Sequence, residues 1–375
     1  MSHPEFDLEA GLIYLNHAGV GPWPKRTSEA ICRFAEENRQ RGAADYPRWL
    51  TVEKRLRENL RRLINAPSSD DIALVKNTSE ALSLVAYGLP WKEGDNIVTS
   101  TEEFPSNRIP WESLQAQGVE LREAELDSGS DPEAALFELV DRRTRLITIS
   151  SVQYASGRRM DLERIGDFCR RQGILFCVDA IQSVGALRTD VQAWQADFVM
   201  ADGHKWLVAP EGLGLFYTTP ESRERLRLTQ FGWHMVENAG DYECRDWHPA
   251  TSARRFECGS PNMLGIHGLE ASTALLLQEG MDQVEARVLA NAAWLIQVIG
   301  REPNLECLTP PERHGGIVTF RPLSIPPTAL FEHLRRHRVV CALRGGGIRF
   351  SAHFYNDTEN LKKTMALITT SSPKA

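Results

Sequence analysis

The chain has 375 residues, of which 42% are apolar and 25% charged, an ordinary composition for a globular protein with a sizeable core. Its formal net charge of −7, from 43 basic and 50 acidic residues, argues against nucleic acid as a partner. No apolar run approaches the length of a membrane span, and the N-terminus does not read as a secretory signal. We therefore expect a cytoplasmic protein without membrane contact.

The cysteines point the same way. There are seven, none of them in a C-x-x-C pair, and several lie in apolar contexts. The odd number and the contexts favour reduced, buried thiols over disulfides, as in a cytosolic protein. We expect no metal site.

Through the first three quarters of the chain, short apolar runs alternate with amphipathic segments. Residues 145–152 read as a buried strand, and 161–173 as a helix with Asp161 as its N-cap and Gly173 as its stop. Further apolar runs follow at 174–181, 197–202 and 212–219. This alternation predicts an α/β fold with a mainly parallel sheet flanked by helices.

The pattern changes after about residue 275. Residues 269–300 read as one long helical stretch, followed by a strand, a helix and a final strand in 315–354. We therefore expect three parts: an N-terminal arm at 1–20, a large domain at 21–278 and a small C-terminal α+β domain at 279–375.

Two charged residues end neighbouring apolar runs. Asp179 closes ILFCVD, Lys205 follows DFVMADG, and Gln182 comes three residues after Asp179. Ligands of open α/β sheets bind beyond the carboxyl ends of the strands, so these side chains are candidates for one site. A simple Asp–Lys salt bridge that closes two strands is the alternative.

A second candidate is the start of a predicted helix at NTSEAL, where Thr78 and Ser79 follow Asn77. A helix N-terminus with free N–H groups and hydroxyls binds anions such as phosphate, although a plain N-cap is the simpler interpretation. The chain has neither a P-loop motif nor a G-x-G-x-x-G after a strand, so a smaller phosphorylated cofactor fits better than a nucleotide.

The third candidate is Phe104, which follows the predicted strand NIVTS. Such an aromatic is usually a core residue, but here it is placed to stack on a flat ring. A lysine for a Schiff base, an aspartate for a pyridine nitrogen, a phosphate seat and a stacking ring together indicate pyridoxal 5′-phosphate. An imine between Lys205 and the cofactor would also explain why a lysine follows a buried apolar run, because the imine spares the protein a buried ammonium group.

The motifs resemble, in order and over nearly the whole chain, the class V aminotransferase and cysteine desulfurase family. They are YLNHAGVGPWP (14–24), NTSEAL (77–82), EFPSNRIPW (103–111), VQYASG (152–157), VDAIQSVG (178–185), DGHKWL (202–207), RRFECGSPN (254–262) and RGGGIRFSAHFYN (344–356). The resemblance implies the fold-type I architecture of pyridoxal-phosphate enzymes and a homodimer with shared active sites. Its substrate would be a small molecule, an α-amino acid.

The resemblance also implies roles for single residues. Lys205 is the Schiff-base lysine and the base at Cα, Asp179 partners the pyridine nitrogen, and Phe104 stacks on the ring. Gln182 partners the ring hydroxyl, and Arg349 binds the substrate carboxylate. The remaining candidates are Thr78, Ser79, His204 and Ser260 for the phosphate, the last reaching the neighbouring subunit's site, and Arg344, Asn16 and His17 for the substrate; a structural role is the alternative for Asn16 and His17.

The chain departs from the family pattern at three points. Asp202 stands where many relatives have a hydroxyl residue, and we expect its carboxylate to face groups other than the phosphate. Phe104 stands where desulfurases carry a histidine. RGGGIR holds no cysteine between Arg344 and Arg349, and Cys341 just upstream reads as an ordinary buried thiol.

These departures predict a poor cysteine desulfurase and leave several reactions open. We expect an aminotransferase. A C–S lyase (β-lyase) or an epimerase of the same family is the alternative, and a non-catalytic pyridoxal-phosphate-binding module is a remote one.

Overall fold

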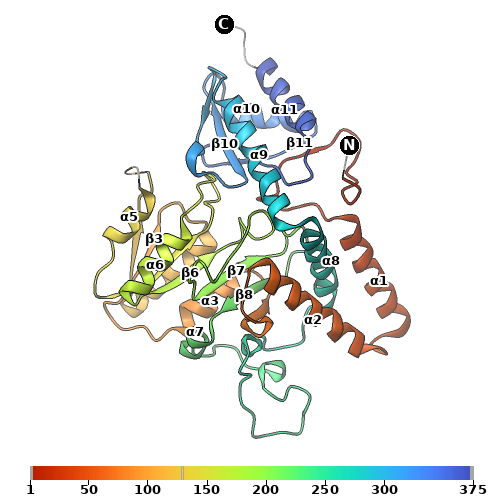
Figure 1. Ribbon diagram of the computed structural model, residues 1–375, viewed down its shortest axis with the longest axis vertical. Helices are drawn as coiled ribbons and strands as arrows, with labels where there is room; N and C mark the ends of the chain where they lie inside the picture. Colours follow the sequence, from red (N-terminus) through yellow and green to blue (C-terminus); the bar gives the residue numbers. More distant parts are fainter. Residues whose placement is uncertain (1–2, 128, 130, 372–375) are drawn as a thin grey trace.

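The computed structural model describes residues 3–127, 129 and 131–371, and its central feature is a seven-stranded sheet (Figure 1). The strands are β2 (Ile72–Val75), β3 (Asn96–Ser100), β4 (Glu120–Ala124), β5 (Thr144–Ser150), β6 (Leu175–Asp179), β7 (Phe198–Asp202) and β8 (Gly214–Thr218), in the spatial order β2-β8-β7-β6-β5-β3-β4. The predicted α/β fold is confirmed, and the sheet is parallel except at β8. That strand runs antiparallel to both of its neighbours.

Alternate residues of each strand enter opposite cores. Val178 and Val199 pack on one side with α2 (Tyr46–Leu63), α6 (Leu162–Gln172) and α8 (Met263–Glu279), while Cys177 and Met200 pack on the other side with α3 (Thr78–Gly88). Because both faces are covered, the strands need continuous apolar runs, and this is why the sequence reveals them. The other helices of this part are α1 (Lys25–Arg41), α4 (Ile109–Glu112), α5 (Pro132–Glu138) and α7 (Pro220–Arg225).

The C-terminal part builds a second, antiparallel sheet with the order β12-β13-β10-β9. Its elements are α9 (Met281–Ile299), β9 (Leu305–Cys307), β10 (Ile317–Pro322), α10 (Pro327–Arg336), β12 (Ala342–Arg344), β13 (Gly347–Ser351) and α11 (Thr358–Ser371). Figure 1 shows this sheet with α10 and α11 at one end of the molecule, reached along α9. The sheet and its helices enclose a separate hydrophobic core. The domain boundary near residue 278 stays a prediction.

Two features differ from the sequence-based expectation or add to it. The stretch 269–300 is not one helix, because Gly280 ends α8 with a φ of +80° and α9 starts at the next residue. The N-terminal segment is anchored at the C-terminal part, since β1 (Ile13–Tyr14) pairs in parallel with β11 (Val339–Val340).

All seven cysteines are free. Among the described residues, none of the helices has the length and apolar character required to cross a membrane.

Candidate active site

A cavity of about 310 Å³ opens at the carboxyl ends of β6 and β7. Nine of the twelve candidate residues line it: Thr78, Ser79, Phe104, Asp179, Gln182, His204, Lys205, Arg344 and Arg349. Asn16, His17 and Ser260 are not among its lining residues. The sheet thus brings together side chains that lie up to 271 positions apart, from Thr78 to Arg349.

Lys205 and Asp179 face each other across the ends of two adjacent parallel strands. Burial lowers the pKa of Lys205 below that of a free lysine, although the nearby Asp179 carboxylate opposes this change. Burial also raises the pKa of Asp179, while the N–H of Ile181, which donates to its Oδ1 at 3.0 Å, acts in the opposite direction. A lysine that loses its proton easily is suited to forming a Schiff base.

The start of α3 offers an anion site on the same cavity. Asn77 caps the helix by accepting the Glu80 N–H at 2.9 Å. Thr78 Oγ1 is buried and has no hydrogen-bond partner among the described residues, and the Ser79 hydroxyl donates to Ser106 Oγ at 2.9 Å. An unpaired buried hydroxyl at a helix N-terminus is what an incoming phosphate would satisfy.

Asp202 and His204 form a pair beside this anion site. Asp202 is buried, and its Oδ1 lies 3.0 Å from His204 Nδ1. The imidazole therefore lies against the carboxylate, which is the kind of neighbour that we expect for Asp202 in place of the phosphate.

The N-terminal segment forms one wall of the cavity, where Ala18 and Gly19 line it. Gln182 joins this wall to the sheet, since its Nε2 donates to the Ala18 carbonyl at 3.2 Å and its Oε1 accepts from Trp206 Nε1 at 2.9 Å. One amide hydrogen of Gln182 remains for a ligand. These contacts also fix the orientation of the amide, because an indole N–H is only a donor.

Arg349 supplies a buried cation to the cavity. It is 4% exposed, its Nη1 donates to the Tyr154 carbonyl at 2.8 Å, and its Nε has no partner among the described residues. Burial and the neighbouring Arg344 lower the pKa of Arg349 to about 10, so it stays charged at neutral pH. Arg344 is exposed at the rim. A buried guanidinium with an unused N–H is suited to a carboxylate ligand.

The three candidates outside the cavity have other surroundings. Both ring nitrogens of the buried His17 are engaged, with the Ser351 carbonyl at 2.8 Å and the Tyr355 hydroxyl at 2.6 Å, an arrangement typical of a structural histidine. Asn16 is partly buried, and its Oδ1 has no partner in the described part of the chain. Ser260 is exposed.

Three residues that the sequence analysis did not single out belong to the site or its support. Ser106 and Tyr154 line the cavity, and Glu103 is buried directly before the lining residue Phe104. All three lie inside the quoted motifs EFPSNRIPW and VQYASG. The motifs therefore located these segments, but nothing in them shows which side chains turn inward.

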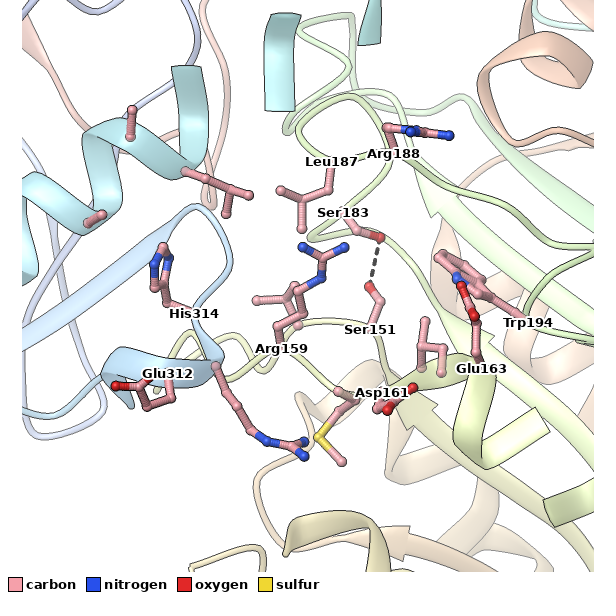
Figure 2. Close-up of a pocket in the computed structure, with 17 residues that line it drawn as sticks. Ser151, Arg159, Asp161, Glu163, Ser183, Leu187, Arg188, Trp194, Glu312 and His314 are labelled. Atoms are coloured by element: carbon pink, nitrogen blue, oxygen red, sulfur yellow. Dashed lines mark hydrogen bonds between the residues drawn. The ribbon is translucent and has the colours of Figure 1, made fainter. Parts of the chain in front are cut away.

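A larger cavity of about 620 Å³ lies between α6 and α9 (Figure 2). Figure 2 shows Ser151 and Ser183 facing each other, and their hydroxyls are 2.8 Å apart. Arg159 is paired with Glu285 at 3.2 Å. No lysine is among its lining residues in the described part of the chain, so the smaller cavity is the better active-site candidate.

Comparison with known proteins identifies the family. Residues 13–364 match the family model described as aminotransferase class-V. The chain belongs to this family. A probable cysteine desulfurase of Methanothermobacter thermautotrophicus is 31% identical, over 93% of this chain and 92% of the relative.

Solved structures agree on the class V fold. The apo cysteine desulfurase of Thermococcus onnurineus superposes with a TM-score of 0.85 at 25% identity, over 96% of this chain and 94% of that one. A cystine C–S lyase in complex with its product, cysteine persulfide, superposes with a TM-score of 0.89 at 24% identity, over 97% and 99%. These structures confirm the predicted fold-type I architecture.

This class V family member is a pyridoxal-phosphate enzyme, as the resemblance implied. The residues of the cavity fit that cofactor, because Thr78 offers an unpaired buried hydroxyl at the start of α3 and Lys205 and Asp179 line the same cavity. The expectation of an aminotransferase is less well supported, since the relatives favour the C–S lyase alternative.

Proposed function

We propose that this protein is a C–S lyase that cleaves the Cβ–S bond of a sulfur-containing amino acid by β-elimination. The preferred substrate carries a good leaving group at Cβ, as the disulfide cystine does, because its Cβ–S bond can break to release a persulfide. Support comes from relatives named cysteine desulfurase and from the structural likeness to a cystine C–S lyase.

One observation carries the choice of elimination over desulfuration, namely that no cysteine is among the described residues lining the cavity. The segment between Arg344 and Arg349 is a hairpin whose loop is only Gly345 and Gly346, since Arg344 pairs with Gly347. Such a turn has no room for a mobile thiol that could take the sulfur from the substrate. In the proposed reaction the sulfur therefore leaves with the electron pair of the Cβ–S bond.

Cys341 does not replace the missing thiol. It is buried at 7% exposure in the core of the C-terminal sheet, and burial raises the pKa of its thiol to about 12. A sulfur nucleophile reacts as the thiolate and must approach the reacting atom closely. Cys341 meets neither condition.

The chain's own residues divide the work of elimination. Arg349 binds the substrate carboxylate, and the Lys205 amine removes the proton at Cα. Pyridoxal phosphate, when bound, supplies an electron sink for the pair left at Cα, and Asp179 stabilises the protonated ring nitrogen that makes it one. The Cβ–S bond then breaks, its electrons leave on sulfur as a persulfide, and the 2-aminoacrylate that is released hydrolyses to pyruvate and ammonium.

The experiment compares products from cystine, from cysteine and from an amino acid paired with a 2-oxo acid. We expect pyruvate and ammonium in equal amounts from cystine, at the same rate in Cys341→Ala. Alanine together with a persulfide on the protein, formed from cysteine and lost in Cys341→Ala, would establish a desulfurase instead. Amino-group exchange with the 2-oxo acid would establish an aminotransferase.

We also propose a homodimer in which the partner covers the cavity face. Large apolar side chains are exposed at the cavity and on the N-terminal segment that follows the lining residue Gly19: Phe104 at 39%, Val20 at 42% and Trp23 at 45%. Ser260 lies outside its own chain's cavity lining, which is compatible with the proposed contact to the partner's phosphate. The exposed apolar surface gives the association a driving force.

A further inference from the structure

Glu103 is a buried carboxylate, 4% exposed, directly before Phe104. Its Oε1 accepts hydrogen bonds from Ser150 N at 2.8 Å and Gln153 Nε2 at 2.7 Å. Its Oε2 accepts from Ser150 Oγ at 2.5 Å and Asn107 Nδ2 at 2.8 Å. No basic side chain of the described residues forms an ion pair with it, so neutral donors alone hold this carboxylate.

The direction of the Asn107 contact is fixed by its other neighbours. Trp111 Nε1 donates to Asn107 Oδ1 at 3.0 Å, and the Thr148 hydroxyl donates to the same oxygen at 2.8 Å. Because an indole N–H is only a donor, Oδ1 must face Trp111 and the amide NH₂ must face Glu103. Each oxygen of Glu103 therefore meets an N–H donor.

The donors come from separate segments around the cavity. Ser150 ends β5 and pairs with Asp179 in the sheet, Gln153 precedes the cavity residue Tyr154, and Asn107 follows Phe104 in the same turn. Burying a carboxylate away from water is unfavourable, and burial raises the pKa of Glu103. A group this costly to bury is better explained by a task at the site than by stability alone.

The Phe104 side chain needs such an anchor. Its ring is 39% exposed, meets Tyr154 edge-on at 5.1 Å between centroids, and lies 5.5 Å from Lys205 Nζ. Packing around a ring this open does not fix its position. The backbone must do so, and the Phe104 carbonyl accepts the Asn107 N–H at 2.8 Å within the turn that Glu103 ties down.

We infer that Glu103 is a positioning residue whose carboxylate ties the Phe104 turn to β5 and to the Gln153 segment, and so holds the Phe104 ring over the cofactor ring. The inference rests on the proposed stacking role of Phe104. It is independent of which reaction follows, because it concerns only how the cofactor ring is held.

A double-mutant cycle tests it through binding of pyridoxamine 5′-phosphate, which has the ring and the phosphate but forms no Schiff base with lysine. Dissociation constants are measured on the cofactor-free protein. Phe104→Leu should weaken binding about tenfold, as loss of one aromatic contact does. Glu103→Gln, which sets an NH₂ group against an N–H donor, should weaken it by a similar factor. The double variant should bind no more weakly than Phe104→Leu alone.

Glu102→Gln is the matched control. Its carboxylate accepts from the Ser156 hydroxyl at 2.7 Å and lies 3.5 Å from Arg158 Nε. It should change the dissociation constant less than twofold. Thermal melting of each cofactor-free variant shows that it is folded.

Ser150→Ala serves if Glu103→Gln does not fold, since it removes only one donor to Glu103. It should weaken binding less than Glu103→Gln does, and again without adding to Phe104→Leu. Effects that multiply in the double variants, or wild-type binding in Phe104→Leu, would overturn the inference. Failure of the wild-type protein to bind pyridoxal phosphate at all would instead contradict the proposed function.

Discussion

At the scale of single residues, Lys205 is the group that we propose as the anchor of the cofactor. Sodium borohydride reduces a lysine–pyridoxal-phosphate imine to a stable bond, so we expect the reduced protein to carry one cofactor per chain. Lys205→Ala should abolish this covalent label. Lys76→Ala is the matched control, because Lys76 precedes the same phosphate end but is exposed and lies 3.5 Å from Glu80. Mass spectrometry of the reduced proteins reads out both, and a label that survives in Lys205→Ala would place the anchor elsewhere.

Asp179 should affect turnover much more than cofactor binding. Asp179→Asn keeps an oxygen that can accept the Ile181 N–H but removes the negative charge that we propose partners the ring nitrogen. We expect the cofactor to stay bound and turnover to fall by about a hundred- to a thousandfold, which corresponds to about 3–4 kcal/mol of transition-state stabilisation.

The control for this charge effect is Asp197→Asn, at a carboxylate that accepts the Phe176 N–H at 2.8 Å at the other end of the strands. It should lower the melting temperature and leave turnover per folded molecule near the wild-type value. Equal turnover in Asp179→Asn and the wild type would remove the electron-sink role.

At the scale of secondary-structure elements, the β12–β13 hairpin positions both candidate arginines. Its two loop residues have positive φ, +58° at Gly345 and +75° at Gly346, as tight hairpin turns require. A Cβ at Gly346 meets no atom within 4 Å, so Gly346→Ala adds backbone strain without a clash. We expect it to cost about 1 kcal/mol of stability and to raise KM severalfold by moving Arg349 and Arg344.

Gly11→Ala is the control that separates the effect of backbone strain from the effect of moving the two arginines. Gly11 also has a positive φ, +78°, with open space around it, but it lies outside the cavity lining. Its alanine variant should lose similar stability in denaturant unfolding and keep the wild-type KM. If KM is equally unchanged in Gly346→Ala, the hairpin does not set the substrate site.

The elements that could be predicted best from the sequence are those whose signals lie in neighbouring residues, such as apolar runs and helix caps. The runs ending at Asp179 and Lys205 are apolar because both sheet faces are covered, and Asp161 and Gly173 bound α6 as their residue types indicate. Strand direction is a long-range property, so the antiparallel sense of β8 left no local signal. The sequence analysis did not single out Glu103, because the burial of its carboxylate depends on distant donors from Ser150 and Gln153.

At the scale of the whole molecule, separate sequence segments form one cavity. The N-terminal segment pairs with β11, and Gly21 donates to the His204 carbonyl at 2.7 Å. Arg349 comes from the C-terminal sheet and reaches the Tyr154 carbonyl, which belongs to the large sheet's loops. If Arg349 binds the substrate as proposed, we expect substrate binding to depend on how the two sheets are held together.

The proposed homodimer makes the last prediction. If Ser260 contacts the partner's phosphate, Lys205→Ala and Ser260→Asp inactivate different halves of one shared site: the first removes the anchor, and the second sets a negative charge against the phosphate. A mixed dimer then has one doubly damaged site and one intact site. When equal amounts of the two variants exchange subunits at random, roughly a quarter of wild-type activity should return. About half of the dimers are then mixed, and half of the sites in these mixed dimers are intact.

Two measurements make this result decisive. Size-exclusion chromatography with light scattering gives the mass of the active species, which should be that of two chains. Separately tagged variants, purified through both tags, give pure mixed dimers that should reach about half of wild-type activity. Recovery depends on sites completed by the other chain, since neither variant alone holds an intact site. Inactive mixed dimers, or full activity in a demonstrated monomer, would show that each chain completes its own site and that Ser260 does not act on the partner's phosphate.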